Sequence, residues 1–309
     1  MTLQQLEYVI ALDTYRHFVT AAEKSFVTQP TLTMQLMKLE DEIGVQIFDR
    51  TKKPMVPTKA GEQFVLKARQ ILREVSQLKE MISSDKNILK GEFRIGVIPT
   101  LAPYIVPLFL KEFIHDNPQT HLKIYEMQSE DIIKSLKHDV LDIGLLVTPL
   151  NEKSLREVPL FYEPFLLYVP DDYAAENQKS INPVDIDRSK VLLLNQGHCF
   201  RNQTLEICNH SNTGTVLGFE YESGSIEALK GLVKKGIGIT LVPELSVLNE
   251  LDSNNVIRLD EPEPVREVSI VVHQSFTKEP LIDEIRKGIL SNIPSRFMKN
   301  EKRIRVKWR

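Results

Sequence analysis

The chain has 309 residues, a net charge of −3 and only two cysteines. We expect a cytosolic protein, because the sequence shows neither a signal peptide nor an apolar run of transmembrane length, and a structural disulfide is not expected in that setting. The 42% of hydrophobic residues suffices for buried cores, and the length predicts two or three compact units. The net charge favours no class of partner, so the local distribution of charge is more informative.

Two short helices are predicted before residue 25. Leu3, Leu6 and Val9 recur at helical spacing and indicate the first helix. The second helix covers residues 21–24, and Thr20 is a suitable N-cap for it.

A third helix is predicted to begin after Thr28, which can cap its N-terminus, and Pro30 is tolerated in its first turn. Its apolar stripe consists of Leu32, Leu36, Leu39 and Ile43. The other faces carry amides, small hydroxyl side chains and a cation, namely Gln29, Thr31, Thr33, Gln35 and Lys38.

The second and third helices, joined by a tight turn, match a helix-turn-helix whose second helix enters the major groove of DNA. Gln can read adenine edges, while Thr and Lys suit phosphates or bases. Residues 48–58 then predict a hairpin with cations at its tip, which resembles a wing lying along the DNA backbone. The candidate DNA-contacting residues are Gln29, Pro30, Thr31, Thr33, Gln35, Lys38, Arg50 and Lys52. The same pattern also fits an ordinary amphipathic helix followed by a solvated loop.

A long helix is predicted from Thr58, a suitable N-cap, to about Ile82. Its apolar positions follow the a/d spacing of a heptad seam, namely Phe64, Ala68, Ile71, Val75, Leu78 and Ile82. Packing within its own domain is one explanation. A dimerisation helix fits better, because so long a helix with a narrow stripe needs a partner and a reader of two DNA half-sites is a dimer. Residues 83–87 predict the linker that follows.

Beyond residue 90 the sequence alternates between strand and helix patterns, which predicts parallel α/β sheets with ligands at the carboxyl ends of strands. Neither a dinucleotide-binding glycine motif nor a Walker loop is present. The basic tail 302–309 is expected to be disordered and solvated. The predicted strands are 93–98, 122–125, 143–147, 165–169, 191–194, 237–242 and 268–272, and the predicted helices are 104–114, 132–137, 226–235 and 279–289.

The two cysteines, Cys199 and Cys208, lie nine positions apart in one segment. On a helix this spacing separates the Cα atoms by about 13–14 Å, whereas a disulfide requires less than about 7 Å. If the reduced segment is helical, oxidation therefore requires refolding, which suggests a redox switch. Two other interpretations are a pair of inert buried thiols and a zinc site with His198 and His210, although the spacing matches no standard zinc site.

Residues 1–86 resemble the N-terminal domain of LysR-type transcriptional regulators, from Ala21-Ala22 through the 29–33 and 38–40 stretches to Gly44, 48–50 and 58–61. Residues 91 to about 295 resemble the effector domain of that family, which is similar to periplasmic binding proteins and includes the 235–243 stretch. The segment from Gly197 to Cys208 is similar to the peroxide-sensing OxyR branch.

The resemblance implies a winged helix-turn-helix domain, a dimerisation helix and a two-subdomain α/β effector domain. It implies a cytoplasmic regulator of transcription rather than an enzyme, without a cofactor or metal, that binds double-stranded DNA and responds to hydrogen peroxide. It further implies a homotetramer formed by two dimers, RNA polymerase as a partner, and glutaredoxin or thioredoxin as reductant. The expected domains are 1–58, 59–88 and 89–309, the last divided into about 91–163 with 266–295, and 164–265.

The resemblance also implies that Cys199 is the peroxide-reactive thiol and Cys208 the resolving thiol. Thr100, Ser129, His198 and Arg266 are then the residues that surround the peroxide. The chemistry agrees, since a nearby cation such as Arg266 favours the reactive thiolate, and hydroxyl groups can hold peroxide oxygens. The usual threonine of this branch is replaced by Ser129, which keeps the hydroxyl and lacks the methyl group that helps fix its rotamer.

Three alternatives remain at this point. Arg266 could pair at the surface with Glu263 or Glu267. The chain could be a LysR-type regulator that binds a small metabolite in the cleft between subdomains. It could also be a thiol peroxidase that turns over catalytically.

Overall fold

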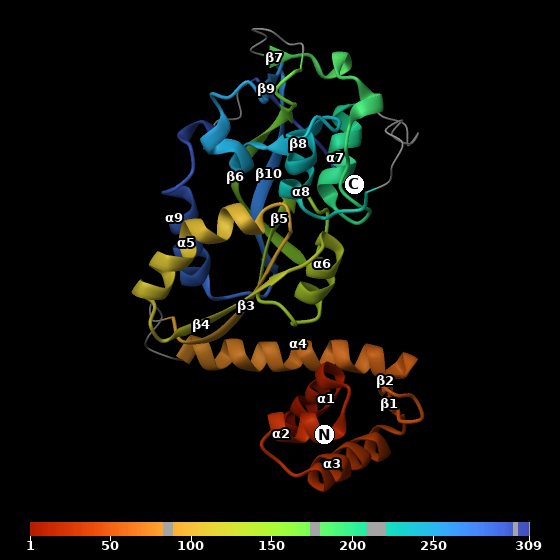
Figure 1. Cartoon of the computed structure of the whole chain (residues 1–309). Helices are drawn as coiled ribbons and strands as arrows, with labels where there is room; N and C mark the ends of the chain where they lie inside the picture. The colour runs from red at the N-terminus through yellow and green to blue at the C-terminus, as the bar shows by residue number, and fades with distance from the viewer. Residues whose placement is uncertain (83–88, 174–179, 209–220, 299–301, 309) are drawn as a thin grey trace. The chain divides into compact units, whose positions relative to one another are not determined.

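The computed structural model describes residues 1–82, 89–173, 180–208, 221–298 and 302–308. The chain divides into two compact units, Met1–Asn87 and Ile88–Arg309 (Figure 1). The expected linker at 83–87, His210 and the last residue of the tail lie outside the described residues. In the described parts of the chain, no helix is long and apolar enough to cross a membrane.

The first unit is helical with one small hairpin, as predicted. Thr28 caps the third helix by accepting a hydrogen bond from the Thr31 N–H, and Leu32, Leu36 and Leu39 are buried. The elements are α1 (Leu3–Tyr15), α2 (Phe18–Lys24), α3 (Gln29–Ile43), the antiparallel strands β1 (Phe48–Asp49) and β2 (Val56–Pro57), and α4 (Lys59–Ile82).

The predicted start of α2 is wrong. The helix begins at Phe18 with His17 as its N-cap, so Thr20 lies inside the first turn rather than before it. The Thr20 hydroxyl lies 3.3 Å from His17 Nδ1. A threonine that bonds locally from within a helix gives the same sequence pattern as one that caps it, which explains the error.

The predicted N-cap of α4 is confirmed, because the Thr58 hydroxyl accepts a hydrogen bond from the Gly61 N–H at 2.9 Å. The first half of α4 packs against α1, which buries Val65 and Ala68. Farther along the helix, Ile71 is 39% exposed and Leu78 is 59% exposed. The heptad seam therefore serves two purposes: its beginning packs within the unit, and its later positions remain open.

The second unit is built on one mixed sheet with the strand order β4-β3-β5-β10-β6-β9-β7, in which β11 pairs with β10 and β8 pairs with β6. The strands are β3 (Gly91–Val97), β4 (Thr120–Glu126), β5 (Ile143–Thr148), β6 (Leu155–Tyr168), β7 (Ser180–Ile181), β8 (Thr240–Pro243), β9 (Val256–Leu259), β10 (Glu263–His273) and β11 (Arg303–Arg305). The α-helices are α5 (Ala102–Asp116), α6 (Ser129–Lys137), α7 (Cys199–Ile207), α8 (Ile226–Val233) and α9 (Glu279–Leu290), and short 3-10 turns include Glu244–Glu250 and Ser295–Met298.

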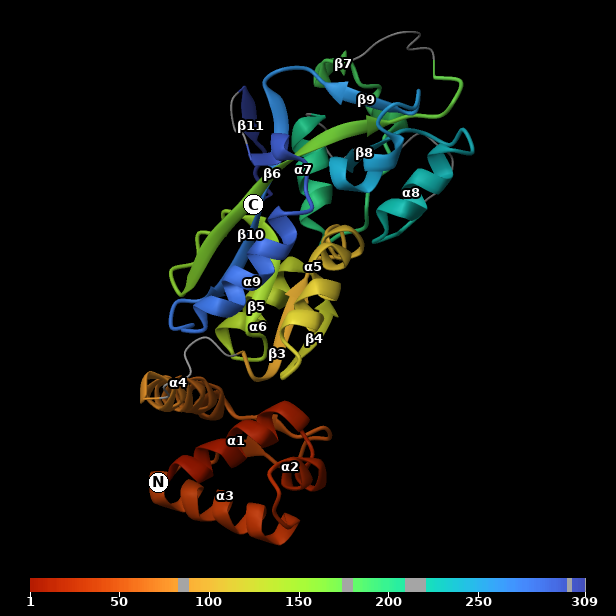
Figure 2. The same cartoon turned by 90° about the vertical axis from the view of Figure 1, so that its left-hand side faces the viewer.

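The predicted parallel sheets are present only in part, because the sheet is mixed. Strand β3 is parallel to β4 and β5, whereas β10 is antiparallel to both β5 and β6, and β6 is antiparallel to β8 and β9. The reason is topological: β6 leads from the first lobe of this unit into the second, and β10 leads back, so the two strands must run in opposite directions (Figure 2). The predicted strand at 191–194 is also absent, and Val191 forms only an isolated bridge to Ile239.

The second unit has two hydrophobic cores, and β6 contributes residues to both. Phe161 of β6 belongs to the first core, with residues of β3, β5, α5 and α9. Phe165, only four positions later on the same strand, belongs to the second core, with residues of β8, β9 and α8. The two cores therefore meet where β6 and β10 lie side by side.

The expectation of a disordered tail is wrong for residues 302–308. Strand β11 pairs in parallel with β10, and Val306 and Trp308 are only 5% and 6% exposed. Their backbone carbonyls accept hydrogen bonds at 3.1 Å from the side chains of Gln203 and Asn202 on α7. The overlooked signal is the alternation of charged and apolar residues from 303 to 308, which is the period of a half-buried strand.

Burial of the tail predicts a stability effect. Trp308→Ala should lower the free energy of unfolding of the second unit by about 3 kcal/mol, because it leaves a cavity in the first core. Ile304→Ala is the control, since Ile304 lies in the same segment and is 54% exposed; it should change stability by less than about 0.5 kcal/mol. Thermal unfolding of the two variants measures this difference, and equal effects would contradict the docked position of the tail.

Candidate functional site

The proposed DNA-contacting residues of α3 fall into two groups. Gln29, Pro30 and Lys38 are exposed. The hydroxyl groups of Thr28 and Thr31 lie 2.8 Å apart, and Gln35 accepts a hydrogen bond from Gln5 of α1 at 3.3 Å, while Thr33 is also partly covered. The side chains of Thr31 and Gln35 thus have partners within the first unit.

The two hairpin cations differ in their surroundings. Arg50 pairs with Glu40 of α3, and its guanidinium lies 6.0 Å from the centre of the Phe18 ring. Glu40 also accepts the Ile47 N–H at 2.7 Å, so this ion pair fastens the hairpin to α3. Lys52 is exposed at the tip of the hairpin.

A second candidate site surrounds Cys199, the first residue of α7. The Cys199 thiol is buried and has a hydrogen bond with Ser129, the first residue of α6. Arg266 of β10 donates from Nη1 to the Thr100 hydroxyl at 2.9 Å and from Nη2 to the Thr100 carbonyl at 3.0 Å. The positive charge of Arg266 also acts on the thiol. The structure thus brings Thr100, Ser129, Cys199 and Arg266 together from four separate parts of the chain.

His198, the fourth residue expected around the peroxide, is the N-cap of α7. Its ring lies against Gly224, where a Cβ atom would come within 2.8 Å of His198 Nε2. Burial lowers the pKa of His198, which favours the neutral imidazole. His198 therefore brings a neutral ring to the start of α7, next in sequence to Cys199, rather than a second cation, and its observed neighbour is Gly224.

Glu163 of β6, which was not among the predicted site residues, is fully buried and pairs with Arg266. Arg266 Nε donates to Glu163 Oε2 at 2.8 Å, and the Leu245 N–H donates to Oε1 at 2.9 Å. The surface alternative for Arg266 is wrong, because Glu263 and Glu267 pair with other arginines and Arg266 is inaccessible. The sequence did contain a signal for Glu163, because it is the single acidic residue within the apolar run 160–169.

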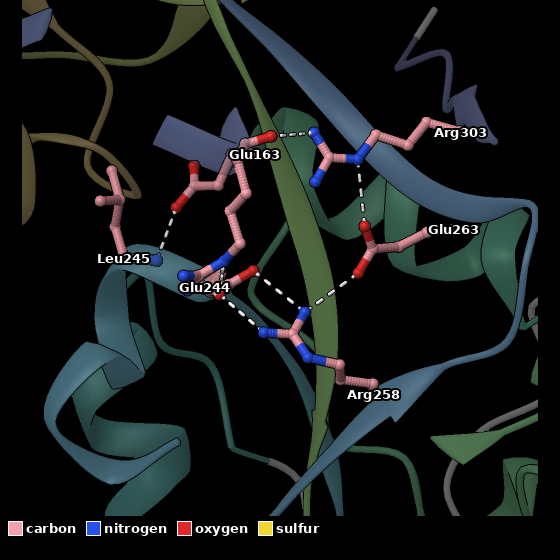
Figure 3. A network of polar contacts seen from close by, with 7 residues as sticks. Glu163, Glu244, Leu245, Arg258, Glu263 and Arg303 are labelled. Atoms are coloured by element: carbon pink, nitrogen blue, oxygen red, sulfur yellow. Dashed lines mark hydrogen bonds and ion pairs between the residues drawn. The ribbon is translucent and has the colours of Figure 1, made fainter. Parts of the chain in front are cut away.

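Glu163 adjoins a wider set of ion pairs (Figure 3). Glu244, next to Leu245, is fully buried and pairs with Arg258 at 2.9 Å. Arg258 in turn pairs with Glu263, which also pairs with Arg303 of β11, each at 3.1 Å. These contacts connect the 244–250 turn with β9, β10 and the C-terminal strand.

The acid–base properties of the two thiols follow from their burial. Burial raises the pKa of Cys199, and the Arg266 charge and the Ser129 hydrogen bond oppose this effect. The expected influence of Arg266 is therefore present, but burial outweighs it. Burial likewise raises the pKa of Cys208 to about 11, against a smaller opposing effect of Arg188. Both resting thiols are protonated near neutral pH.

The two cysteines stand at opposite ends of α7 as free thiols. Cys208 is the C-cap, and its N–H donates to the Thr204 carbonyl at 3.0 Å. The side chain of Cys199 packs in the first hydrophobic core and that of Cys208 in the second. The segment is thus helical, and the separation of about 13–14 Å expected for a helix applies.

Comparisons with known proteins agree over nearly the whole chain. Residues 3–62 match the family of bacterial regulatory helix-turn-helix proteins, lysR family, and residues 86–291 match the LysR substrate binding domain. The DNA-binding transcriptional dual regulator OxyR of Escherichia coli K12 is 34% identical over 97% of this chain and 98% of its own length. A hydrogen peroxide-inducible genes activator of Pectobacterium carotovorum is 36% identical over 88% of this chain and 90% of its own length.

Solved structures show the same relationship. Full-length OxyR of Pseudomonas aeruginosa, in a variant with aspartate in place of a cysteine, has a TM-score of 0.83 and 32% identity, with 94% of this chain and 98% of that chain covered. A hydrogen-peroxide-bound OxyR mutant of Corynebacterium glutamicum has a TM-score of 0.58 and 25% identity over 94% and 93% of the two chains. The chain belongs to the LysR family of bacterial helix-turn-helix transcriptional regulators and, within it, to the OxyR branch.

Proposed function

We propose that this protein is a cytoplasmic, DNA-binding transcription regulator that detects hydrogen peroxide through Cys199. The observation that carries the proposal is the placement of Cys199 at the start of α7, beside Ser129, Arg266 and the adjoining Thr100, with Cys208 at the end of the same helix. The peroxide named for relatives in the OxyR branch supports the choice of oxidant.

The proposed reaction has two steps, each of which releases water. The Cys199 sulfur, as thiolate, attacks one peroxide oxygen, the O–O bond breaks, and the departing hydroxide takes up the thiol proton, which leaves a sulfenic acid. In this proposal the hydroxyls of Thr100 and Ser129 and the Arg266 guanidinium bind the peroxide and stabilise the leaving oxygen, and His198 is the fourth residue of the proposed peroxide site. The Cys208 sulfur then attacks the sulfenic sulfur, a disulfide forms, and two electrons have passed from the cysteines to peroxide.

Disulfide formation requires α7 to unwind, because the helix keeps the two Cα atoms about twice as far apart as a disulfide allows. Phe200, Gln203 and Thr204 are buried in the helical form. Unwinding gives up this burial and the bond from Gln203 to the Val306 carbonyl of the tail. These losses offset the new covalent bond, so the reduced and oxidised folds stay close enough in free energy for a reversible switch.

The roles of the two cysteines can be separated by mutation. After one equivalent of peroxide, Cys208→Ser should form a sulfenic acid at Cys199 and keep α7 helical, whereas Cys199→Ser should do neither. Mass spectrometry of trapped sulfenic acid and hydrogen exchange over residues 199–208 test this. If peroxide leaves the protection of these residues unchanged in the wild-type protein, the switch does not operate.

We further propose a homotetramer of two dimers, in which residues 59–88 join chains and 89–309 form the two-subdomain sensor. Repacking of α7 would then alter the subunit arrangement and the spacing of the winged helix-turn-helix domains, residues 1–58. RNA polymerase and a thiol reductant such as glutaredoxin or thioredoxin are the proposed further partners.

Pairing through α4 rests on its exposed seam positions. Ile71→Glu combined with Leu78→Glu should reduce the assembled mass at least twofold, because two buried carboxylates per chain would oppose a paired helix. Leu66→Glu is the control, since Leu66 is also exposed on α4 but lies off the seam. Sedimentation of the full chain gives the mass, and an unchanged value in the double variant would rule out this interface.

The proposed DNA contacts differ in kind between α3 and the wing. Lys52→Ala should weaken binding equally for all sequences and lower the salt slope of the affinity by about one phosphate unit. Gln29→Ala should instead reduce discrimination between base pairs, because an amide on α3 reads base edges. Lys153→Ala, an exposed lysine of the second unit, is the charge control. A slope equal to that of the control would place Lys52 away from the DNA.

A further inference from the structure

Arg266 lies between two groups that use different edges of its guanidinium. On one side Nη1 and Nη2 hold Thr100, and on the other Nε and Nη2 face Glu163 Oε2, at 2.8 and 2.7 Å. Its carbon Cζ lies 5.4 Å from the centre of the Phe200 ring on α7. Both members of the pair are fully buried, so water does not screen their charges.

The contacts of Glu163 favour the ionised carboxylate. Oε2 accepts from Arg266, and Oε1 accepts the Leu245 N–H. Burial raises the pKa of Glu163 and the nearby Glu244 charge adds to this effect, while the Arg266 charge and both hydrogen bonds lower it. In the described surroundings each carboxylate oxygen faces a donor, and a protonated acid would direct its own hydrogen at one of them. The geometry therefore corresponds to an ion pair with no net charge.

We infer that Glu163 is a positioning residue for the thiol chemistry: it fixes the Arg266 guanidinium on Thr100 and cancels most of the charge that Cys199 would otherwise experience. This inference rests on the proposed function, in which Cys199 is the sensing thiol. Glu163 thereby limits the reactivity of the resting thiol while it keeps the donors of Arg266 in place for an oxidant.

The other titratable groups near this pair are either neutral or paired with another residue. Tyr104 of α5 donates its hydroxyl to Glu227, and burial raises its pKa further above the ordinary value, so it is neutral. Glu244 is paired with Arg258, and His198 favours its neutral form. Arg266 is thus the charged group that acts on the Cys199 thiol, and Glu163 is its buried partner.

The test is a pH titration of thiolate absorbance in a Cys208→Ser background, in which Cys199 is the only thiol. Glu163→Gln leaves the guanidinium charge uncancelled, so the thiolate midpoint should fall by about one pH unit or more, which is about tenfold more thiolate at a given pH. Arg266→Gln should raise the midpoint. In the double variant both charges are gone, and the midpoint should return close to that of the parent protein.

Two controls separate charge from packing. Glu163→Asp keeps the charge and should restore the parent midpoint. Glu244→Gln removes a neighbouring buried carboxylate that pairs with Arg258 instead of Arg266, and it should leave the midpoint in place.

If folded Glu163→Gln had the same thiolate midpoint as the parent protein, the inference would be overturned. Where the single variants fail to fold, the double variant decides: a midpoint near the parent supports charge cancellation, and a clearly raised midpoint means that Arg266 acts alone. Because the titration needs no peroxide, it is independent of the proposed function. If wild-type Cys199 failed to react with peroxide, that function would be refuted, and the titration would still report the effect of Glu163 on the thiol.

Discussion

The buried ion pair of Glu163 and Arg266 is the interaction on which the sensor unit depends. The two charges sit on β6 and β10, the strands that connect its two cores, and they join Thr100 on one side to Leu245 on the other. Desolvating two charges is costly, and loss of one partner would leave the other buried and unpaired. This location therefore makes the same contact responsible for the junction of the lobes and for the electrostatic environment of Cys199.

Helix α7 is held in its reduced form by contacts from both sides. Cys199 packs in one core and Cys208 in the other, so a disulfide must remove at least one of them from its core. The C-terminal tail adds bonds to Asn202 and Gln203. In the proposed switch, the burial of this helix opposes oxidation, and the new covalent bond has to overcome it.

Local signals in the sequence predicted what local physics determines. Thr28 and Thr58 identified helix starts, and the apolar stripe of α3 identified its buried face. The direction of β10 was not predictable in this way, because it depends on the chain crossing between lobes twice. Glu163 was missed for a related reason, since its partner is 103 positions away and only the sheet register brings them together. The alternation of charged and apolar residues in the tail was visible in the sequence, but the charged residues suggested a tail exposed to solvent.

The raised pKa of Cys199 constrains how such a site can react at all. Each unit by which burial raises the pKa removes about tenfold of the thiolate at neutral pH, so the proposed reaction begins from a mostly protonated thiol. In that reaction, stabilisation is most effective as the O–O bond breaks, when negative charge develops on the leaving oxygen. Thr100, Ser129 and the Arg266 guanidinium are fixed around the thiol before an oxidant arrives. Under the proposed function, a protonated thiol beside preorganised donors would select for peroxide, because those donors would bind the leaving oxygen.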